Sequence, residues 1–298
     1  MATKVPAFTL TGGTYSTAVK NGYWYIYIKS GSGAKLTFSY DKKIELFLVG
    51  GGGAGGNGHS RAGGGGGGGG ACAMFTNISV AAGNAYAITV GTGGSGAAGG
   101  ASAAFGYSAA GGSKGANATW HSAGAGGAGG AKASGAYVSY AGGKGGKGGN
   151  YAEDEEYDDL FANGANGTMR EFGSSDTNLP LYGPGGGGAS WHTTGGKGGS
   201  TGGGHGAETA TAGTANTGGG GGGGQGEGDG TNGAKGGSGI VIIRGTQDDN
   251  LPVYFGGKQL TEIYFNGEKI SGLIYGGTRV FAGAMRRLLG KAAQAATA

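Results

Sequence analysis

The sequence lacks several features on which common folds depend. It holds one cysteine, Cys72, and four prolines in 298 residues. A single cysteine excludes a disulfide scaffold, and so little proline excludes collagen. No apolar run reaches the ~18 residues of a membrane helix, and residues 1–13 lack the apolar core of a secretion signal. We therefore expect no membrane insertion, and synthesis in the cytoplasm without a signal peptide.

Charged side chains are also scarce, at 13% of the chain, and the formal net charge is only +4. So small an excess gives no reason to expect a nucleic-acid partner. The chain has no Gly-Lys-Ser/Thr tripeptide for a phosphate-binding loop, and no pattern groups a nucleophile with a base. Cys72 lies between Ala71 and Ala73, a setting typical of a buried, inert thiol. We expect neither enzymatic activity nor a cofactor.

Glycine is abundant instead: the chain has 83 glycines, and 69 of them lie in residues 50–239. Glycine loses more backbone entropy on folding than any other residue, so this composition raises the alternative of a mobile glycine linker array. The low charge, the β-type segments that flank the block and a local glycine period all favour an ordered structure.

The glycine block contains two patterns. Residues 63–70 and 218–224 are pure glycine, whereas elsewhere Gly-Gly pairs separate single residues, as at Lys144 and Lys147. A polyproline-II-type helix has three residues per turn and no internal hydrogen bonds, so every third residue falls on one edge. Bare glycine edges let neighbouring helices approach and pair sideways. We predict a polyglycine-II bundle with the pure-glycine runs in its middle.

Strand-like segments surround and interrupt this block. Residues 23–28, 36–40 and 44–49 are rich in aromatic and β-branched residues, and we expect Gly31 and Gly33 to break the first strand. Residues 74–80, 86–90 and 239–244 are expected to return and pair with them. The predicted fold is all-β: a small antiparallel core from residues 1–49, with a glycine-rich domain over 50–245 projecting from one end.

The C-terminal part has its own pattern. Residues 250–281 contain three similar units at ten-residue spacing, with Gly-Gly or Asn-Gly at their centres. These dipeptides suit two-residue hairpin turns, and the sequence predicts a β-hairpin module. Residues 282–298 are predicted to hold a short basic helix that docks on a partner, or a frayed tail.

The order of these motifs resembles the glycine-rich domain of tailed-phage and prophage tail proteins over roughly residues 10–245. The segments that carry the resemblance are 48–53, 88–91, 102–106, 169–173, 214–224 and, most specifically, Gly-Ser-Gly-Ile-Val-Ile-Ile-Arg at 237–244. The resemblance implies a virion protein related in design to the polyglycine-sandwich adhesins of tail-fibre tips. Its implied partners are other tail or virion proteins, a second copy of the chain, or a bacterial surface receptor.

Aromatic residues in the islands between glycine tracts are the candidate receptor contacts. Trp120-His121 and Trp191-His192 each open a Gly-Gly-X tract, and tryptophan offers a large contact area at a low entropy cost. The alternative is that each tryptophan caps the end of a bundle beside a solvated histidine. The candidate contacts are Trp120, His121, Tyr137, Tyr140, Tyr151, Tyr157, Phe161, Trp191 and His192.

Six acidic residues gather in residues 153–159. This run suggests a solvated loop, with a calcium site or a receptor contact as alternatives. Adhesion predicts that deletion of residues 151–182 leaves assembly intact but abolishes adsorption. The histidines have no close-spaced pair that would bind a metal.

The expected function is a tail-associated adhesin. The alternatives are a structural or decoration protein without a receptor and an ice-binding rod, which the lysines on the X edge disfavour.

Overall fold

The computed structural model describes residues 4–120, 122–150, 161–191, 195–200 and 202–246, and the strands between 253 and 281. Within these residues the fold is all-β, without an α-helix. The strands of the main sheet are β1 (Phe8–Lys20), β2 (Tyr23–Phe38), β3 (Lys42–Val49), β4 (Cys72–Val80), β5 (Ala85–Thr89), β6 (Ser102–Ala104), β7 (Tyr107–Ala109), β8 (Val138–Tyr140) and β9 (Ile240–Thr246), and η1 (Glu171–Gly173) is a 3₁₀ turn.

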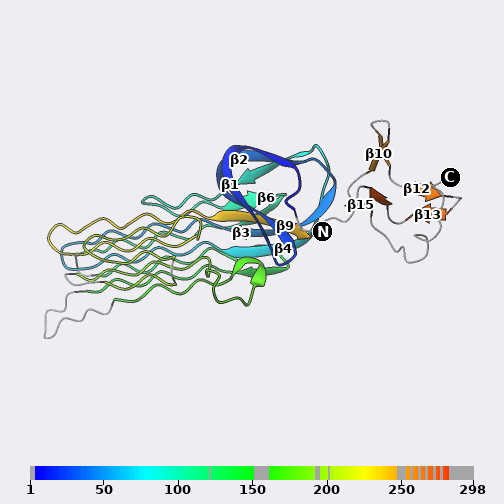
Figure 1. Ribbon diagram of the computed structural model, residues 1–298. Coiled ribbons are helices and arrows are strands. Elements are labelled where there is room, and N and C mark those ends of the chain that lie inside the picture. Colours follow the sequence, from blue (N-terminus) through cyan, green and yellow to red (C-terminus); the bar gives the residue numbers. More distant parts are fainter. Residues whose placement is uncertain are drawn as a thin grey trace. The chain divides into compact units, whose positions relative to one another are not determined.

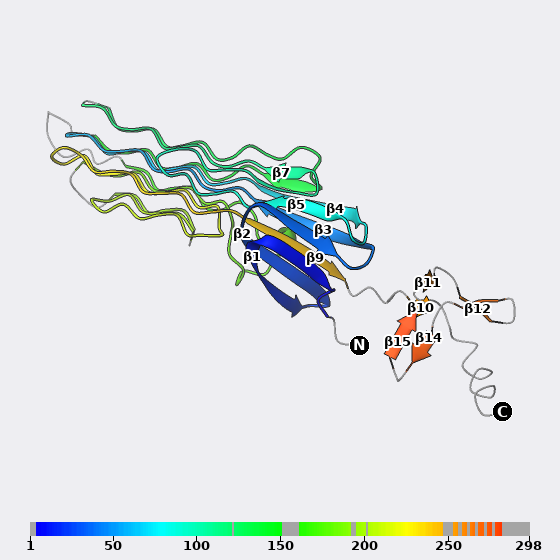
Figure 2. The same ribbon diagram turned by 90° about the horizontal axis from the view of Figure 1, so that it is seen from above.

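These nine strands form one sheet in the order β7-β6-β5-β2-β9-β3-β4-β8, with β1 also paired to β2. As the sequence predicts, β4 and β9 return to flank β3, and β5 pairs with β2, all antiparallel. Tyr107 on β7 stacks on Phe75 of β4 with ring centroids 4.2 Å apart, although these strands lie far apart in the sheet order. The sheet must therefore curl, and it forms a half-barrel (Figure 2).

The expected break in the first strand is wrong. β2 continues from Tyr23 to Phe38, through both glycines. Gly33 has a φ of 72°, and the pairing register with β5 shifts between Ser32 and Ala34. Glycine at positive φ is the usual device of a β-bulge, so the glycines bend the strand where the sequence suggested an end.

Aliphatic side chains fill the inside of the half-barrel, and a loop covers its other face. Leu46 and Leu48 of β3 are fully buried, as is Phe47, whose side chain points to the opposite face of the strand. There Phe47 meets Phe172 and Tyr182, with ring centroids 5.7 and 5.4 Å apart. The loop 169–182 therefore supplies core side chains, and it cannot be deleted without exposing this face.

The glycine segments leave the sheet at one end and continue the directions of its strands (Figure 1). Residues 50–58 continue β3, residues 62–71 lead back into β4, and residues 230–239 lead into β9. The extended segments are 50–58, 62–71, 91–94, 97–101, 110–118, 123–131, 141–150, 162–168, 183–191, 195–200, 202–207, 210–214, 218–226 and 230–239.

Segment 62–71 shows how the glycine segments are held together. From Gly63 to Ala71 its backbone N–H groups donate in turn to three different segments, with N···O distances of 2.8 to 3.0 Å. Its carbonyl groups accept from three others: 50–58, 123–131 and 183–191. The direction in which the N–H groups point makes one full turn around the segment every three residues. Gly66, Gly67 and Gly68 donate to Gly146, Gly221 and Ser113, and Gly69, Gly70 and Ala71 repeat this order with Gly143, Gly218 and Ala110.

The close approach of these segments explains the pure-glycine runs. A Cβ atom added at any residue of 63–70 would lie under 3.0 Å from a carbonyl oxygen of a neighbouring segment, closer than real Cβ atoms come. The whole run is buried, as is 218–224. Any side chain at these positions would push apart the segments that accept and donate the backbone hydrogen bonds.

The outer segments differ in the way that their period predicts. In 141–150 the residues Ala141, Lys144 and Lys147 are exposed, whereas most glycines between them are buried. Ala125, Ala128 and Ala131 are likewise exposed in segment 123–131, and the glycines between them are buried or half-buried. The single non-glycine residue of each triplet thus lies on the solvent edge.

The C-terminal residues belong with 1–5 and 19–24 to a separate compact unit. Three two-stranded antiparallel sheets occur there, and each pairs across a two-residue connection. Their strands are β10 (Val253–Phe255), β11 (Lys258–Leu260), β12 (Ile263–Phe265), β13 (Glu268–Ile270), β14 (Leu273–Tyr275) and β15 (Thr278–Phe281). The basic helix expected after residue 282 lies outside the described residues. No helix in the described part of the chain is long and apolar enough to cross a bilayer.

Candidate functional site

The ends of the glycine segments opposite the sheet carry a group of short connections, here called the distal turns: residues 57–62, residues 118–120 with 122, and residues 225–231. Backbone bonds hold them side by side. Ala118 donates to the carbonyl of Asn57 at 2.8 Å, and Gly58 donates to the carbonyl of Thr231 at 2.9 Å. The turn 59–62 is closed by reciprocal bonds between His59 and Ala62. The distal turns are therefore fixed relative to one another.

An aromatic and cationic cluster lies on these turns. The Trp120 side chain is 49% exposed, and the Arg61 guanidinium carbon lies 5.6 Å from the centre of its ring. The His59 ring meets the same indole edge-on, with centroids 5.9 Å apart. A cation over the face of an indole is a favourable pairing. The cluster offers a partner an apolar ring surface bordered by hydrogen-bond donors.

The third distal turn adds polar groups of the opposite charge. Glu227 and Asp229 are exposed there, and Gly230 closes the turn by donating to the carbonyl of Glu227 at 3.0 Å. Beside them the Gln225 side chain is buried, and its Oε1 atom has no hydrogen-bond partner among the described residues. The distal surface thus combines an aromatic ring, a guanidinium and two carboxylates on rigid supports.

The chain matches the family described as "Glycine-rich domain" over residues 29–246, nearly three quarters of its length. It belongs to this glycine-rich domain family. The match begins within β2, ends with β9, and includes every glycine segment and all three distal turns. A search of curated proteins found no match to the chain.

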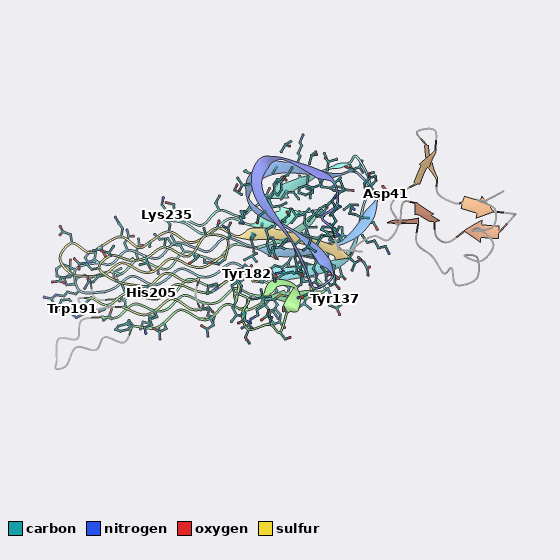
Figure 3. The ribbon with its side chains drawn as sticks, viewed as in Figure 1. Asp41, Tyr137, Tyr182, Trp191, His205 and Lys235 are labelled. Carbon is teal, nitrogen blue, oxygen red and sulfur yellow. The ribbon has the colours of Figure 1, made fainter. Side chains whose placement is uncertain are left out.

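The glycine-rich domain places the predicted contact residues at two opposite ends. Trp191 lies at the distal end and Tyr137 at the sheet end (Figure 3). Trp120 lies in a distal turn, beside the bridge between Thr119 and Ser122, whereas Tyr140 is the last residue of β8. Phe161, half-buried, precedes Ala162, which donates to the Lys147 carbonyl. The candidates therefore do not form one patch. His121, Tyr151, Tyr157 and His192, together with the acidic run 153–159, lie outside the described residues.

Sequence reasoning missed Arg61 and His59. Both lie in the short island 57–62, the first interruption between two glycine-rich runs. A short island between two long glycine runs indicates a turn, because the chain must reverse direction there to return to the sheet. The position of residues 57–62 in a distal turn could therefore have been predicted from the sequence. The turn that brings Trp120 against it joins two other segments, and that contact depends on the packing order of the segments.

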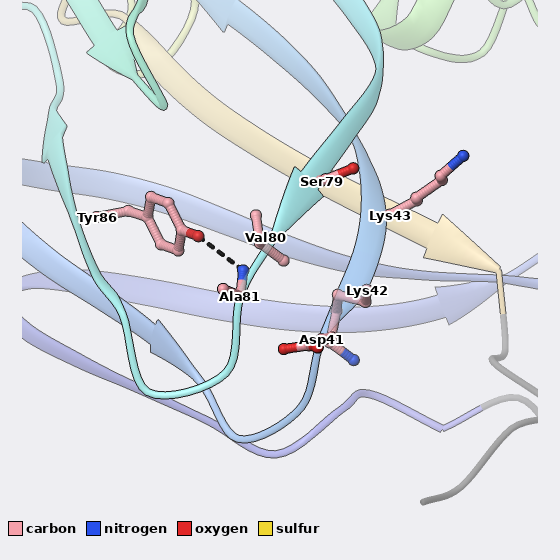
Figure 4. Close-up of a pocket in the computed structure, with 7 residues that line it drawn as sticks. All are labelled: Asp41, Lys42, Lys43, Ser79, Val80, Ala81 and Tyr86. Atoms are coloured by element: carbon pink, nitrogen blue, oxygen red, sulfur yellow. Dashed lines mark hydrogen bonds between the residues drawn. The ribbon is translucent and has the colours of Figure 1, made fainter. Parts of the chain in front are cut away.

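A pocket lies at the sheet end of the glycine-rich domain, opposite the distal turns. It is an open pocket of about 440 Å³ lined by Asp41, Lys42, Lys43, Ser79, Val80, Ala81 and Tyr86 (Figure 4). Two of its polar side chains already accept backbone hydrogen bonds. The Tyr86 hydroxyl accepts from the Ala81 N–H at 2.7 Å, and the Asp41 carboxylate accepts from the Ala82 N–H at 2.7 Å. These bonds hold the β4–β5 turn, a structural use of the residues.

Reactive groups are few in the described part of the glycine-rich domain. Cys72 is fully buried, as predicted, and burial raises the pKa of its thiol to about 12, so it carries no thiolate at neutral pH. Burial, with the nearby Glu171, also raises the pKa of the Tyr182 hydroxyl. No group of three or more potential metal ligands occurs among the described residues.

Proposed function

We propose that this protein is a non-enzymatic component of a phage virion, associated with the tail, tail fibre or baseplate, and that it contributes to host-surface recognition through its distal turns. The observation that carries the proposal is the exposed Trp120 ring with Arg61 over its face. An exposed aromatic side chain held by a rigid scaffold is characteristic of binding surfaces. The resemblance of the sequence to tail proteins supplies the biological setting.

We further propose that the glycine segments form a polyglycine-II bundle. The donor direction that turns every three residues supports this assignment, because a polyproline-II-type helix has three residues per turn. The pure-glycine runs occupy positions bonded on all sides, and the X residues occupy the solvent edge. Such a bundle would hold the distal turns stiffly away from the sheet. The three C-terminal hairpins would act as one module that joins the protein to its neighbours in the virion.

The test is binding of the fluorescently labelled protein to candidate host cells, with competition against phage adsorption. Saturable binding that blocks adsorption is expected. The Trp120→Ala variant should lose most of this binding, at about 2 kcal/mol or ~30-fold for a central aromatic contact. Tyr140→Ala is a matched control, because Tyr140 is 46% exposed and lies at the sheet end.

Comparison of the two variants locates the contact at the distal turns or at the sheet end, and the binding assay itself distinguishes adhesion from a structural role. Loss of binding in Tyr140→Ala with none in Trp120→Ala would move the contact to the sheet end. Absence of cell binding by a folded protein would reject adhesion and favour the alternative, a structural or decoration protein of the virion. In that event, crosslinking within purified particles would identify its neighbours.

A further inference from the structure

Strand β1 forms a long edge of the main sheet. Among the strands that the structure describes it pairs only with β2, and it lies at the margin of the sheet (Figure 2). Proteins usually protect such an edge with charges, prolines or short strands, but residues 8–19 contain neither a charge nor a proline. Strands β7 and β8, at the two ends of the sheet order, have three residues each, whereas β1 has 13.

Two observations orient the backbone in the second half of β1. The Thr14 N–H donates to the Ser30 hydroxyl oxygen of β2 at 3.3 Å, so Thr14 faces β2. Asn21 and Gly22 both have a positive φ, as in a two-residue hairpin turn, which directs the carbonyl of the preceding Lys20 toward β2 as well. Successive residues of a strand direct their N–H and C=O groups to opposite sides. The residues of this half that direct these groups away from β2 are therefore Tyr15, Thr17 and Val19.

The side chains of the same three residues share one exposed face of β1. Tyr15 and Val19 are 49% and 47% exposed, and Thr17 is exposed between them, whereas the alternate residues are half-buried. The Phe8 ring meets the Tyr15 ring edge-on, with centroids 5.1 Å apart, which restrains the tyrosine. An aromatic residue and a β-branched residue thus lie at equal distances along the strand from a central threonine.

We propose that β1 pairs antiparallel with β1 of a second copy of the chain, about a twofold axis at Thr17. In this register Thr17 lies opposite Thr17 of the second copy, and Tyr15 lies opposite its Val19. Each of these residues exchanges its backbone N–H and C=O bonds with the residue opposite. Aromatic–β-branched and threonine–threonine pairs are favourable across strands. The two exposed apolar side chains therefore cover each other.

The sequence of β1 favours its own copy over another strand. Because Tyr15 and Val19 are equidistant from Thr17, the strand is complementary to itself when reversed, as an isologous contact requires. Lys20 lies opposite Thr14 of the second copy, so no like charges oppose each other. The exposed lysines of β2 stay apart, because three strand spacings of ~4.8 Å separate the two β2 strands, beyond the ~10 Å over which 0.1 M salt screens charges. This surface does not depend on the distal turns.

The experiment measures self-association of the full chain by sedimentation equilibrium. The parent should dimerise with a dissociation constant below about 100 µM. Thr17→Lys places like charges opposite each other at the twofold axis and should weaken dimerisation at least about tenfold. Thr9→Lys is the matched control, because it adds the same charge at another exposed threonine of β1, outside the paired residues. It should stay within about threefold of the parent, and Trp120→Ala should have no effect.

A mixture of two variants tests the register itself. Thr17→Lys mixed with Thr17→Glu should form a heterodimer more tightly than either variant dimerises alone, because opposite charges then meet at the axis. Both substitutions leave the monomer intact, since the Thr17 side chain is exposed.

Four results would overturn the proposal. A parent that stays monomeric up to about 100 µM would remove the dimer. Equal weakening by Thr17→Lys and Thr9→Lys would reduce the effect to net charge, and the absence of any gain in the mixture would reject the register. Amide protection of Tyr15 and Thr17 that does not change with protein concentration would assign the edge to another part of the same chain.

Discussion

Two glycine segments of equal length, 62–71 and 141–150, have different sequence patterns. Segment 62–71 tolerates no side chain over eight consecutive positions, whereas segment 141–150 carries a side chain at every third position. Both are extended and both bond sideways to their neighbours. The difference lies in surroundings: the first donates to and accepts from segments on every side, and the second has one edge in solvent.

The comparison shows how a core can be built from backbone alone. In the sheet, buried side chains such as Leu46 and Ile242 exclude water. In segment 62–71 no side chain beyond the alanines at its ends does so, and the N–H and C=O groups are satisfied by neighbouring backbones. Glycine is required at these positions because the backbones of neighbouring segments leave no room for a side chain. The pattern of glycines in a segment therefore indicates how many of its sides are covered by neighbours.

Amide exchange gives the largest contrast between the two segments. Every amide of 63–70 donates to another segment, whereas Lys144 and Lys147 make no backbone N–H bond among the described residues. We expect protection at all positions of 63–70, and a repeat of fast-slow-slow exchange along 141–149. The slow amides should exchange at least about 1,000-fold more slowly, or about 4 kcal/mol.

Native-state exchange measured by NMR would test this pattern residue by residue. Exchange at unprotected rates throughout 63–70 would remove the bundle altogether. Uniform protection along 141–149 would instead show that the X edge is covered, and the comparison between the two segments would fail.

Adding one methyl group should break the central segment. In Gly67→Ala the new Cβ would meet the carbonyl oxygens of Gly53 and Ala54 under 3.0 Å, and the backbone cannot yield without losing hydrogen bonds. We expect a loss of about 3 kcal/mol or more in the free energy of unfolding. Gly100→Ala is the matched control, because its Cβ would come no closer than 3.2 Å to Thr92, and it should cost under about 1 kcal/mol.

Chemical denaturation of the two variants measures the difference directly. If both variants unfold at the same denaturant concentration as the parent, the segments are less closely packed than the structure indicates. Should Gly67→Ala not yield soluble protein, limited proteolysis of Gly100→Ala beside the parent would still test whether the outer position tolerates the methyl group.

Much of this architecture was predictable from the sequence, because its two periods are unusually clear. The aliphatic and aromatic runs at 44–49 and 240–243 indicated strands that pair in the core, and β3 and β9 do pair. The pure-glycine runs indicated burial, and 63–70 and 218–224 are buried. A bulge in β2 was not predictable, since the same glycines suit either a break or a bend.

The candidate site was predictable only in part. The Trp120 position at a connection followed from the end of a glycine tract, but its partners Arg61 and His59 come from another turn and depend on which segments are neighbours. In the sequence, Tyr137 shares with Trp120 only its position in an island between glycine tracts. Its separation from Trp120 by the length of the segments follows from the return of the chain to β8.

Alkaline pH should affect the side-chain core and not the glycine segments. The Cys72 thiol, at the junction of segment 62–71 with β4, has its pKa raised from 9.0 to about 12 by burial. The folded state keeps its proton while the unfolded state loses it. The stabilisation present below pH 9 is therefore lost between pH 9 and 12, at up to about 1.4 kcal/mol per pH unit.

The measurement is the difference in unfolding free energy between the parent and Cys72→Ala as pH rises. The parent should lose about 2 kcal/mol more than the variant by about pH 10.5, because other titrating groups cancel in the difference. Parallel pH profiles would show that the thiol is accessible, and rapid thiol labelling of the native protein would support that reading.

The smallest expected effect is on the hydrogen bond between Asn57 and Asn117, in which a side-chain oxygen takes the place of a backbone carbonyl group. The Asn117 side-chain oxygen accepts the N–H of Asn57 at 3.0 Å, in a position that a carbonyl of another segment fills elsewhere along 50–58. Asn117→Ala removes this acceptor, and the exposed N–H can turn to water, so the loss should be only about 0.5–1 kcal/mol. Asn117→Asp keeps an acceptor and should restore most of it. A loss in the aspartate variant equal to that in the alanine variant would mean that the bond contributes nothing, and that outer segments need no substitute for an absent neighbour.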